Sequence, residues 1–214
     1  PQLTYRMKYV IGTANIGSIF ADSYLTPDRF YSIEDKNLSN VWQLNSTFGK
    51  GFNELRVYYQ RERNVRGNNQ DFERFPSVRV DMPDGTQVNF GTEFSSQANK
   101  LNQDVIEITD DYTFIKGRHT FTVGSHNEFY KFWNLFIQAY NGDYRFSSIA
   151  QFQNGISGSY THNFSNTADP QEAASFSVYQ FGLYAGDRWR LGDNFTLTYR
   201  VRADRPRFPD TALA

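Results

Sequence analysis

Residues 174–204 hold two long runs in which apolar and polar side chains alternate one by one. A period of two indicates β-strands, because successive side chains of a strand point to opposite sides of a sheet. The insert Gly192-Asp193-Asn194 between the runs is typical of a hairpin turn. Each run exceeds the about 5–6 residues of a typical globular strand and reaches the about 9–11 residues of a strand that crosses a bilayer. The apolar face holds Tyr179, Phe181, Leu183, Ala185, Trp189, Leu191, Phe195, Leu197, Tyr199 and Val201.

The same alternation recurs along the rest of the chain and predicts seven strands in all. Four polar residues, Asp110, Ser125, Asn127 and Asp187, interrupt the apolar face. They lie either beyond the hydrocarbon or at a bulge that resets the alternation. The predicted strands lie near residues 3–11, 38–48, 52–63, 102–115, 119–133, 175–191 and 195–204.

The connections between these strands alternate strictly between long and short. Residues 12–36, 64–101 and 134–173 are long loops, whereas the other connections are tight turns. Outer-membrane barrels have short periplasmic turns and longer outside loops, whereas a soluble sandwich has no reason to gather its long loops at one end. The pattern therefore predicts an all-β, antiparallel, up-and-down transmembrane β-barrel with three extracellular loops.

Aromatic residues favour the same interpretation. They flank the three short turns, where an interfacial aromatic girdle belongs, although they could also cap a soluble core. The mean hydropathy of −0.64 is that of a soluble protein, but half of each barrel strand faces a polar lumen. The girdle candidates are Phe48, Phe52, Phe114, Trp189 and Phe195.

Composition narrows the function classes. The net charge of −1 gives no reason to expect a nucleic-acid partner, and no apolar run is long enough for a transmembrane helix. The three histidines lack metal-ligand spacing, and no nucleophile elbow, phosphate loop or HExxH helix is present. We therefore predict no enzyme activity and no catalytic, cofactor-binding or metal site.

Two groups of titratable residues need a separate reading. His126 faces the predicted lumen between Gly124 and Glu128, where a hydrogen-bonded wall residue is a simpler interpretation than a ligand or proton-relay residue. Asp110 and Asp111 are adjacent in one strand, so their side chains point to opposite faces and cannot hold one ion together.

The polar faces of the strands form a mixed-charge row that would line the lumen. Opposite charges on neighbouring strands can pair across the sheet. This row either holds a plug or passes a polar substrate, or it is a solvated wall. Its charged members are Arg6, Lys8, Glu54, Arg56, Glu62, Glu107, Asp111, Glu128, Arg188, Arg190, Arg200 and Arg202.

The long loops hold one hairpin candidate and many aromatic residues. The stretch SVRVDMPDGTQVNF turns at Pro83-Asp84-Gly85. The loop aromatics either stack on a sugar or peptide ligand or pack the loops against one another. They are Phe72, Phe75, Phe90, Tyr140, Tyr144, Phe146, Phe152 and Tyr160.

Several stretches resemble the TonB-dependent outer-membrane receptor family. FGLYAGDRWRLGDNFTLTYRVRAD followed by RPRFPD carries the general resemblance, and FTVGSHNEFYKFWNLF and DPQEAASFSVYQFGLY resemble its Oar-like subgroup, in which a carboxypeptidase-regulatory-like domain often precedes the plug and barrel. The similarity is best in residues 119–209. It implies a 22-stranded barrel with a plugged lumen, of which this chain would be a fragment of about a third.

The resemblance implies energy-coupled uptake or reception of an extracellular ligand at the bacterial outer membrane. The partners would be membrane lipid, the protein's own plug domain outside residues 1–214, a TonB-type energy-coupling complex and a ligand that the sequence does not identify. No functional residue carries over, because the family's coupling motif has no counterpart here. A passive porin-like channel and a soluble secreted β-sandwich that binds carbohydrate are the alternatives.

Overall fold

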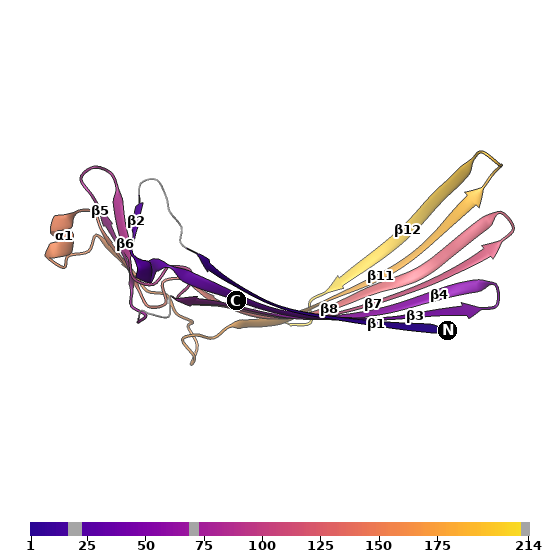
Figure 1. The fold of residues 1–214 in the computed structure, drawn as a ribbon, viewed down its shortest axis with the longest axis horizontal. Helices are drawn as coiled ribbons and strands as arrows, with labels where there is room; N and C mark the ends of the chain where they lie inside the picture. The colour runs from indigo at the N-terminus through magenta and orange to yellow at the C-terminus, as the bar shows by residue number, and fades with distance from the viewer. Residues whose placement is uncertain (17–22, 69–72, 211–214) are drawn as a thin grey trace.

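The computed structural model describes residues 1–16, 23–68 and 73–210, which form two sheets of very different length (Figure 1). The larger sheet is antiparallel throughout, in the order β1-β3-β4-β7-β8-β11-β12. Each strand therefore pairs with the next long strand along the chain, which is an up-and-down arrangement. Its strands are β1 (Gln2–Ile16), β3 (Tyr31–Phe48), β4 (Gly51–Asn68), β7 (Ala98–Lys116), β8 (His119–Ile137), β11 (Ala174–Arg190) and β12 (Thr196–Arg207).

Most strands are longer than the alternation indicated, and the additional length lies mainly at the loop end. β3 begins at Tyr31 rather than near residue 38, and β4 continues to Asn68 rather than ending near residue 63. These extensions are rich in polar residues on both faces, so they carry no alternation for a sequence analysis to detect. A strand of 18 residues is about 60 Å long and exceeds the about 25 Å apolar band of a barrel even when tilted.

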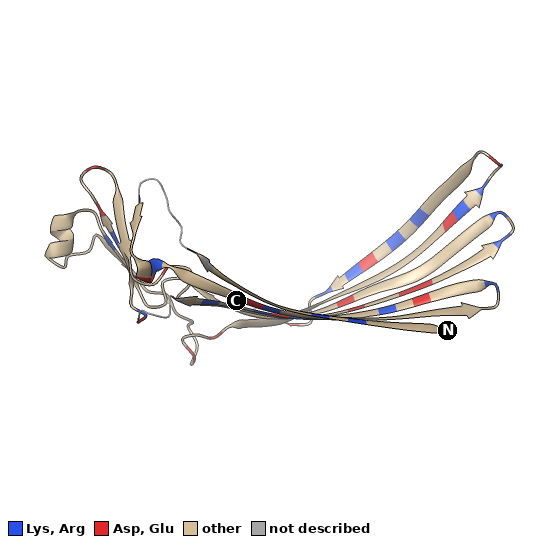
Figure 2. Cartoon of the chain, viewed as in Figure 1, with Lys and Arg blue, Asp and Glu red and all other residues tan. Residues whose placement is uncertain are grey.

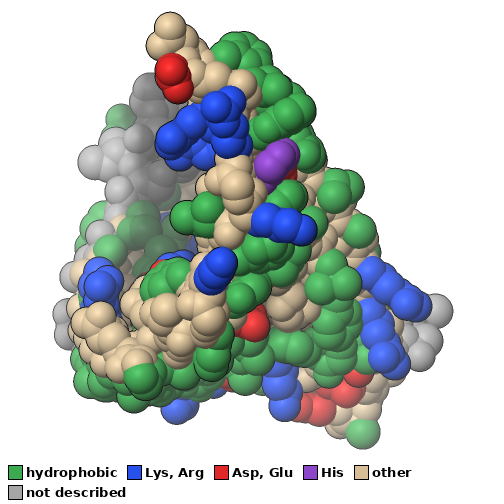
Figure 3. All heavy atoms as spheres, turned by 90° about the vertical axis from the view of Figure 1, so that its right-hand side faces the viewer, with side chains coloured by type: hydrophobic (Ala, Val, Ile, Leu, Met, Phe, Trp, Pro, Cys, Tyr) green, Lys and Arg blue, Asp and Glu red, His purple; other side chains and the backbone are tan. Residues whose placement is uncertain are grey.

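The outer face of the large sheet, defined as the side that holds Leu55, Ile108 and Leu183, is apolar and exposed. Leu183 and Val201 are 67% and 69% exposed. From the end with the short turns, apolar side chains cover the outer side of the curved sheet (Figure 3). This is the surface expected of strands whose outer side chains meet lipid rather than water.

The four polar residues on this face do not mark bulges. All six strand ladders keep one register from end to end, so no extra residue resets the alternation. Each polar residue instead has a side-chain partner. Asp110 accepts from Asn53 at 2.8 Å, Asn127 donates to Ser125 at 3.3 Å, and Asp187 accepts from Tyr199 at 2.9 Å.

An aromatic row borders the apolar band near the short turns. Its rings stack across three strands, with centroids 5.1–5.8 Å apart. His119 joins the row and contacts Asp187 at 2.6 Å, which leaves only 3% of that carboxylate side chain exposed. The row consists of Tyr112, Phe114, Phe121, His119 and Trp189.

A charged row borders the band on the loop side. Arg61, Asp104 and Lys131 lie opposite one another on β4, β7 and β8. One guanidinium nitrogen of Arg63 donates to both carboxylate oxygens of Asp104, at 2.8 and 3.1 Å. Charges continue toward the loop end of the strands (Figure 2). The strands therefore rise beyond the apolar band before the loops begin.

The three long connections fold together into a second sheet, which we call the loop sheet. Its strands are β2 (Ser23–Leu25), β5 (Ser77–Asp81), β6 (Gln87–Phe90), β9 (Asp143–Phe146) and β10 (Ser159–Thr161), in the order β10-β9-β5-β6-β2. The predicted hairpin is confirmed as β5 and β6. The other short strands and the helices η1 (Pro27–Arg29) and α1 (Ile149–Gln153) escaped prediction, because three to five residues are too few to display a period.

The loop aromatics mainly pack the loop sheet. Val78, Val80 and Phe146 form its core, and the ring of Phe152 from α1 lies 5.3 Å from Phe146 and 5.7 Å from Phe90. Tyr160 is an exception, since it is 52% exposed while its ring lies 4.5 Å from Tyr144. Phe72, another of the loop aromatics named from the sequence, lies outside the described residues.

Polar contacts tie the three loops to one another. Arg29 donates to the Ser77 hydroxyl at 2.5 Å, and Asp28 accepts from the Gly91 amide at 2.6 Å. Burial lowers the pKa of Arg29, and the carboxylates of Glu93, Asp143 and Asp28 oppose that shift. Gln97, which is only 1% exposed, donates to the Gly142 carbonyl at 3.1 Å. The loops are therefore one folded unit.

Gly91 offers a test of this unit. It has a φ of +82°, and a Cβ there would lie 2.0 Å from the Pro76 carbonyl oxygen. We expect Gly91→Ala to open the loop sheet and to speed proteolysis of residues 73–97 in the folded membrane protein. Gly85→Ala is the matched control, because Gly85 has a φ of +85° but open space around it, so only about 1–2 kcal/mol of backbone strain applies. Equal cleavage rates in the two variants would contradict the packing described here.

Arginine substitutions on β11 test which face meets lipid. Leu183→Arg should destabilise the barrel by about 2–4 kcal/mol if the side chain lies near the middle of the bilayer. Gln180→Arg should cost little, because position 180 lies on the opposite face and pairs with Glu128. Urea unfolding in lipid vesicles measures both free energies. A cost at position 180 as large as that at position 183 would reverse the assignment of faces.

Candidate functional site

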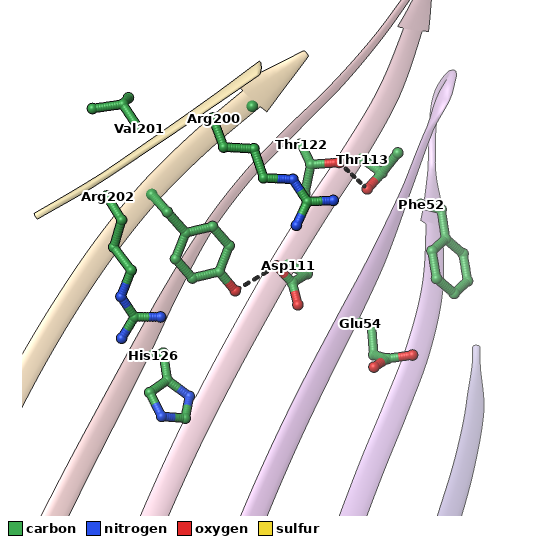
Figure 4. Close-up of a pocket in the computed structure, with 11 residues that line it drawn as sticks. Phe52, Glu54, Asp111, Thr113, Thr122, His126, Arg200, Val201 and Arg202 are labelled. Atoms are coloured by element: carbon green, nitrogen blue, oxygen red, sulfur yellow. Dashed lines mark hydrogen bonds between the residues drawn. The ribbon is translucent and has the colours of Figure 1, made fainter. Parts of the chain in front are cut away.

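The inner face of the large sheet, opposite the apolar one, carries a hollow of about 590 Å³ at the half nearer the short turns. Side chains from β4, β7, β8, β11 and β12 converge on it (Figure 4). Alternation explains the convergence, because every second residue of five paired strands points to this side. The lining residues are Phe52, Glu54, Asp111, Thr113, Thr122, His126, Tyr184, Gly186, Arg200 and Arg202, together with Val201, whose side chain belongs to the outer face.

The floor of the hollow is held by hydrogen bonds between strands. The hydroxyl of Tyr184 donates to the Asp111 carboxylate at 2.6 Å, and the hydroxyls of Thr113 and Thr122 lie 3.0 Å apart (Figure 4). The Tyr184 ring lies beside Gly124, where a Cβ would meet Cε2 of the ring at 2.7 Å. The missing side chain at position 124 therefore lets a β11 tyrosine reach a β7 carboxylate across β8.

The charges around the hollow are divided between its two sides. Glu54 on β4 accepts from Arg56 at 2.6 Å and from Gln43 at 2.8 Å. On the other side, Arg202 pairs with Asp204 at 2.8 Å, and its guanidinium lies 5.7 Å from the Tyr184 ring centroid. Carboxylates thus dominate on β4 and β7, and guanidinium groups dominate on β12.

Arg200 is the cation without an ion pair at this site. Its side chain extends from β12 into the hollow (Figure 4). Among the described residues, the ion pairs involve other arginines and lysines, and none includes Arg200. An arginine whose five N–H donors remain available can bind a carboxylate or phosphate group in a forked geometry.

A smaller hollow of about 330 Å³ lies where the loop sheet meets the ends of β1 and β3. Arg29 and Glu93 bring opposite charges to it, and Tyr31 and Asn89 bring further hydrogen-bonding groups. The molecule therefore offers polar hollows both on the strands and among the loops.

The comparison with protein families decides the class of the protein. The model of a family described as an outer membrane beta barrel domain matches residues 28–211. The chain belongs to this family. Comparisons with curated proteins and with solved structures gave no match. No helix in the described part of the chain is long and apolar enough to cross a membrane.

Membership in the outer membrane beta barrel domain family confirms the predicted fold class and places the protein in the outer membrane. The apolar outer face is then the surface that contacts lipid. This membership excludes the soluble β-sandwich, in which the same outer residues would form a dry core.

The structure brings together only part of the predicted lumenal row. Glu54, Asp111, Arg200 and Arg202 line the large hollow with His126, whereas Arg6 and Lys8 belong to β1 at the far edge of the sheet. Asp110 and Asp111 point to opposite faces, as alternation predicts, and bind Asn53 and Tyr184 respectively.

One girdle residue was assigned to the wrong side. Phe52 lines the inner hollow rather than the lipid surface. Phe52 lies two residues before Glu54 on β4. Alternation alone therefore places it on the inner face, together with Glu54 and Arg56. Thr113, Thr122 and Tyr184 were not singled out by sequence analysis. The alternation of the strands predicts that these three residues lie on the inner face. Only the strand register shows that Thr113 contacts Thr122 and that Tyr184 contacts Asp111.

A double-mutant cycle tests the contact between Tyr184 and Asp111. Tyr184→Phe should destabilise the barrel by about 1.5 kcal/mol, because it removes a hydrogen bond to a charged acceptor. The same change in an Asp111→Asn background should cost about 1 kcal/mol less. Urea unfolding in lipid vesicles measures the four variants. Additive costs would show that the two side chains do not interact.

Proposed function

We propose that this barrel domain belongs to a TonB-dependent receptor that binds a ligand at the cell surface and takes it up with energy from the inner membrane. The observation that carries the proposal is the loop sheet. Three loops that would be free to vary in an open pore are instead packed into one unit through Arg29, Asp28 and Gln97. A preorganised unit at the outer end suits ligand capture, because little conformational freedom remains to be lost on binding.

The proposed mechanism divides the work between loops and wall. The loop hollow around Arg29, Glu93 and Tyr31 would hold a polar ligand first. The large inner hollow carries both carboxylate and guanidinium groups. These groups would then contact either the ligand as it passes through the lumen or a plug domain. A TonB-type partner would supply the energy that displaces the plug. Transport rather than catalysis is the activity assigned to this domain.

The closed barrel must include more strands than the seven described. β1 and β12 form the two edges of the large sheet. Backbone N–H and C=O groups along an edge cost several kcal/mol each in hydrocarbon unless they are paired, so further strands must close the wall. The resemblance to TonB-dependent receptors accounts for them with a 22-stranded barrel around a plug.

A passive porin-like channel is the second candidate, and the polar inner face favours it equally. Conductance distinguishes the two without knowledge of the ligand. We expect the native full-length protein to be silent in a planar lipid bilayer, because a plug fills the lumen. Moderate urea, which unfolds a plug before it unfolds a barrel, should then produce reversible openings. Steady ohmic conductance of the untreated protein would instead establish the porin-like channel.

Binding of the receptor to a TonB-type partner gives an independent test of the proposed energy coupling. The purified receptor in detergent should bind the periplasmic domain of a TonB-type protein, whereas a receptor lacking its plug should not. A silent bilayer with no such binding would support a plugged pore of another kind.

A further inference from the structure

Two glutamates on the inner face lie directly opposite each other on neighbouring strands. Glu107 on β7 pairs with Glu128 on β8 in the strand register. Like charges in this arrangement destabilise a sheet. Both side chains are partly shielded from water, with exposures of 29% and 20%. A cation between them would remove the repulsion.

Lysine and arginine side chains of the described residues do not supply that cation. No ion pair joins a lysine or arginine to either glutamate, and Arg202, which is within electrostatic range of Glu128, is already paired with Asp204. Asp204 is within electrostatic range of His126, but its charge is balanced by Arg202. The only nitrogen ligand among these carboxylates is the imidazole of His126.

The hydrogen bonds around His126 leave one ring nitrogen free to bind a cation. The Thr109 hydroxyl donates to Glu107 at 3.3 Å and lies 2.9 Å from Nδ1 of His126. With the one hydroxyl proton directed at Glu107, Nδ1 donates its own proton to Thr109. In the neutral ring, Nε2 then carries a lone pair that faces Glu128 Oε1 at 3.5 Å. A cation between Nε2 and Oε1 would stabilise this arrangement.

We propose that Glu107, His126 and Glu128 form a binding site for a divalent transition-metal ion such as Zn²⁺. Ligands about 2.1 Å from Zn²⁺ in a tetrahedral arrangement lie roughly 3.4 Å apart, close to the separation of Nε2 and Oε1. One ligand atom from each of the three residues lies within 4.8 Å of the others. Glu107 Oε1 lies 3.7 Å from Nδ1 of His126, so the Glu107 carboxylate must rotate toward Nε2 to bind the same ion.

The neighbouring groups support a metal rather than a simple ion pair. Thr109 fixes the imidazole tautomer, and the Tyr130 hydroxyl donates to Glu128 at 2.9 Å, which orients the carboxylate. One imidazole with two carboxylates suits Zn²⁺, Co²⁺ or Ni²⁺, whereas Ca²⁺ and Mg²⁺ prefer oxygen ligands alone. The inference is independent of the receptor proposal, because a channel wall could carry the same site.

Titration with metal tests the site in the full-length protein folded in detergent micelles. After treatment with a chelator and its removal, calorimetry should show Zn²⁺ binding in the micromolar range or tighter. His126→Ala and Glu128→Gln should each abolish one equivalent of binding or weaken it at least about 10-fold. Co²⁺ as a spectroscopic probe should give visible absorption bands that disappear in the same variants.

The matched control is His162→Ala, which removes a histidine from the loops and should leave binding unchanged. Heat-dependent migration on a gel confirms that each variant is a folded barrel. Glu128→Gln preserves the shape of the side chain, so it serves if His126→Ala fails to fold. The proposal is overturned if the native protein takes up no Zn²⁺, or if folded His126→Ala or Glu128→Gln binds it as the native protein does. An imidazolium shared by the two glutamates would then explain the geometry.

Discussion

The backbone hydrogen bonds of the large sheet are the constraint on which the rest of this structure depends. In hydrocarbon, every N–H and C=O group must find a partner within the protein. The six ladders meet this need with one uninterrupted register each. A slip of one residue would turn every outer side chain inward, so the register also fixes which residues meet lipid and which line the inner hollow.

Polar residues on the outer face are compatible with this constraint because they are paired locally. Asp187 is covered by His119 and Tyr199, and Asp110 is bonded to Asn53. Buried carboxylates without such partners would be costly. The aromatic row at the short turns and the charged row near the loops then limit the apolar band from both sides. Beyond the charged row, the strands leave the hydrocarbon, and the sequence is free to become polar on both faces.

The strands bring side chains together both on the inner face and among the loops. On the inner face, the register sets Tyr184 against Asp111 and Glu107 against Glu128, which creates a hydrogen-bonded floor in one place and a like-charge pair in another. At the loop end, the long strands hold three loops close enough to share one small core around Phe146. Both proposed activities, ligand reception and metal binding, rest on side chains that distant parts of the chain bring together.

The sequence by itself indicated the seven strands of the large sheet, their two faces and the separation of long loops from short turns, because a period of two and the turn residues are local signals. It also indicated the β5–β6 hairpin through Asp84 and Gly85. It missed the loop sheet, since β2, β9 and β10 are too short to show a period and depend on packing between loops. It also missed the meeting of Glu107, His126 and Glu128. Those residues lie on two strands, and no spacing along one chain segment encodes the register that sets Glu107 opposite Glu128; only the tertiary structure decided that contact.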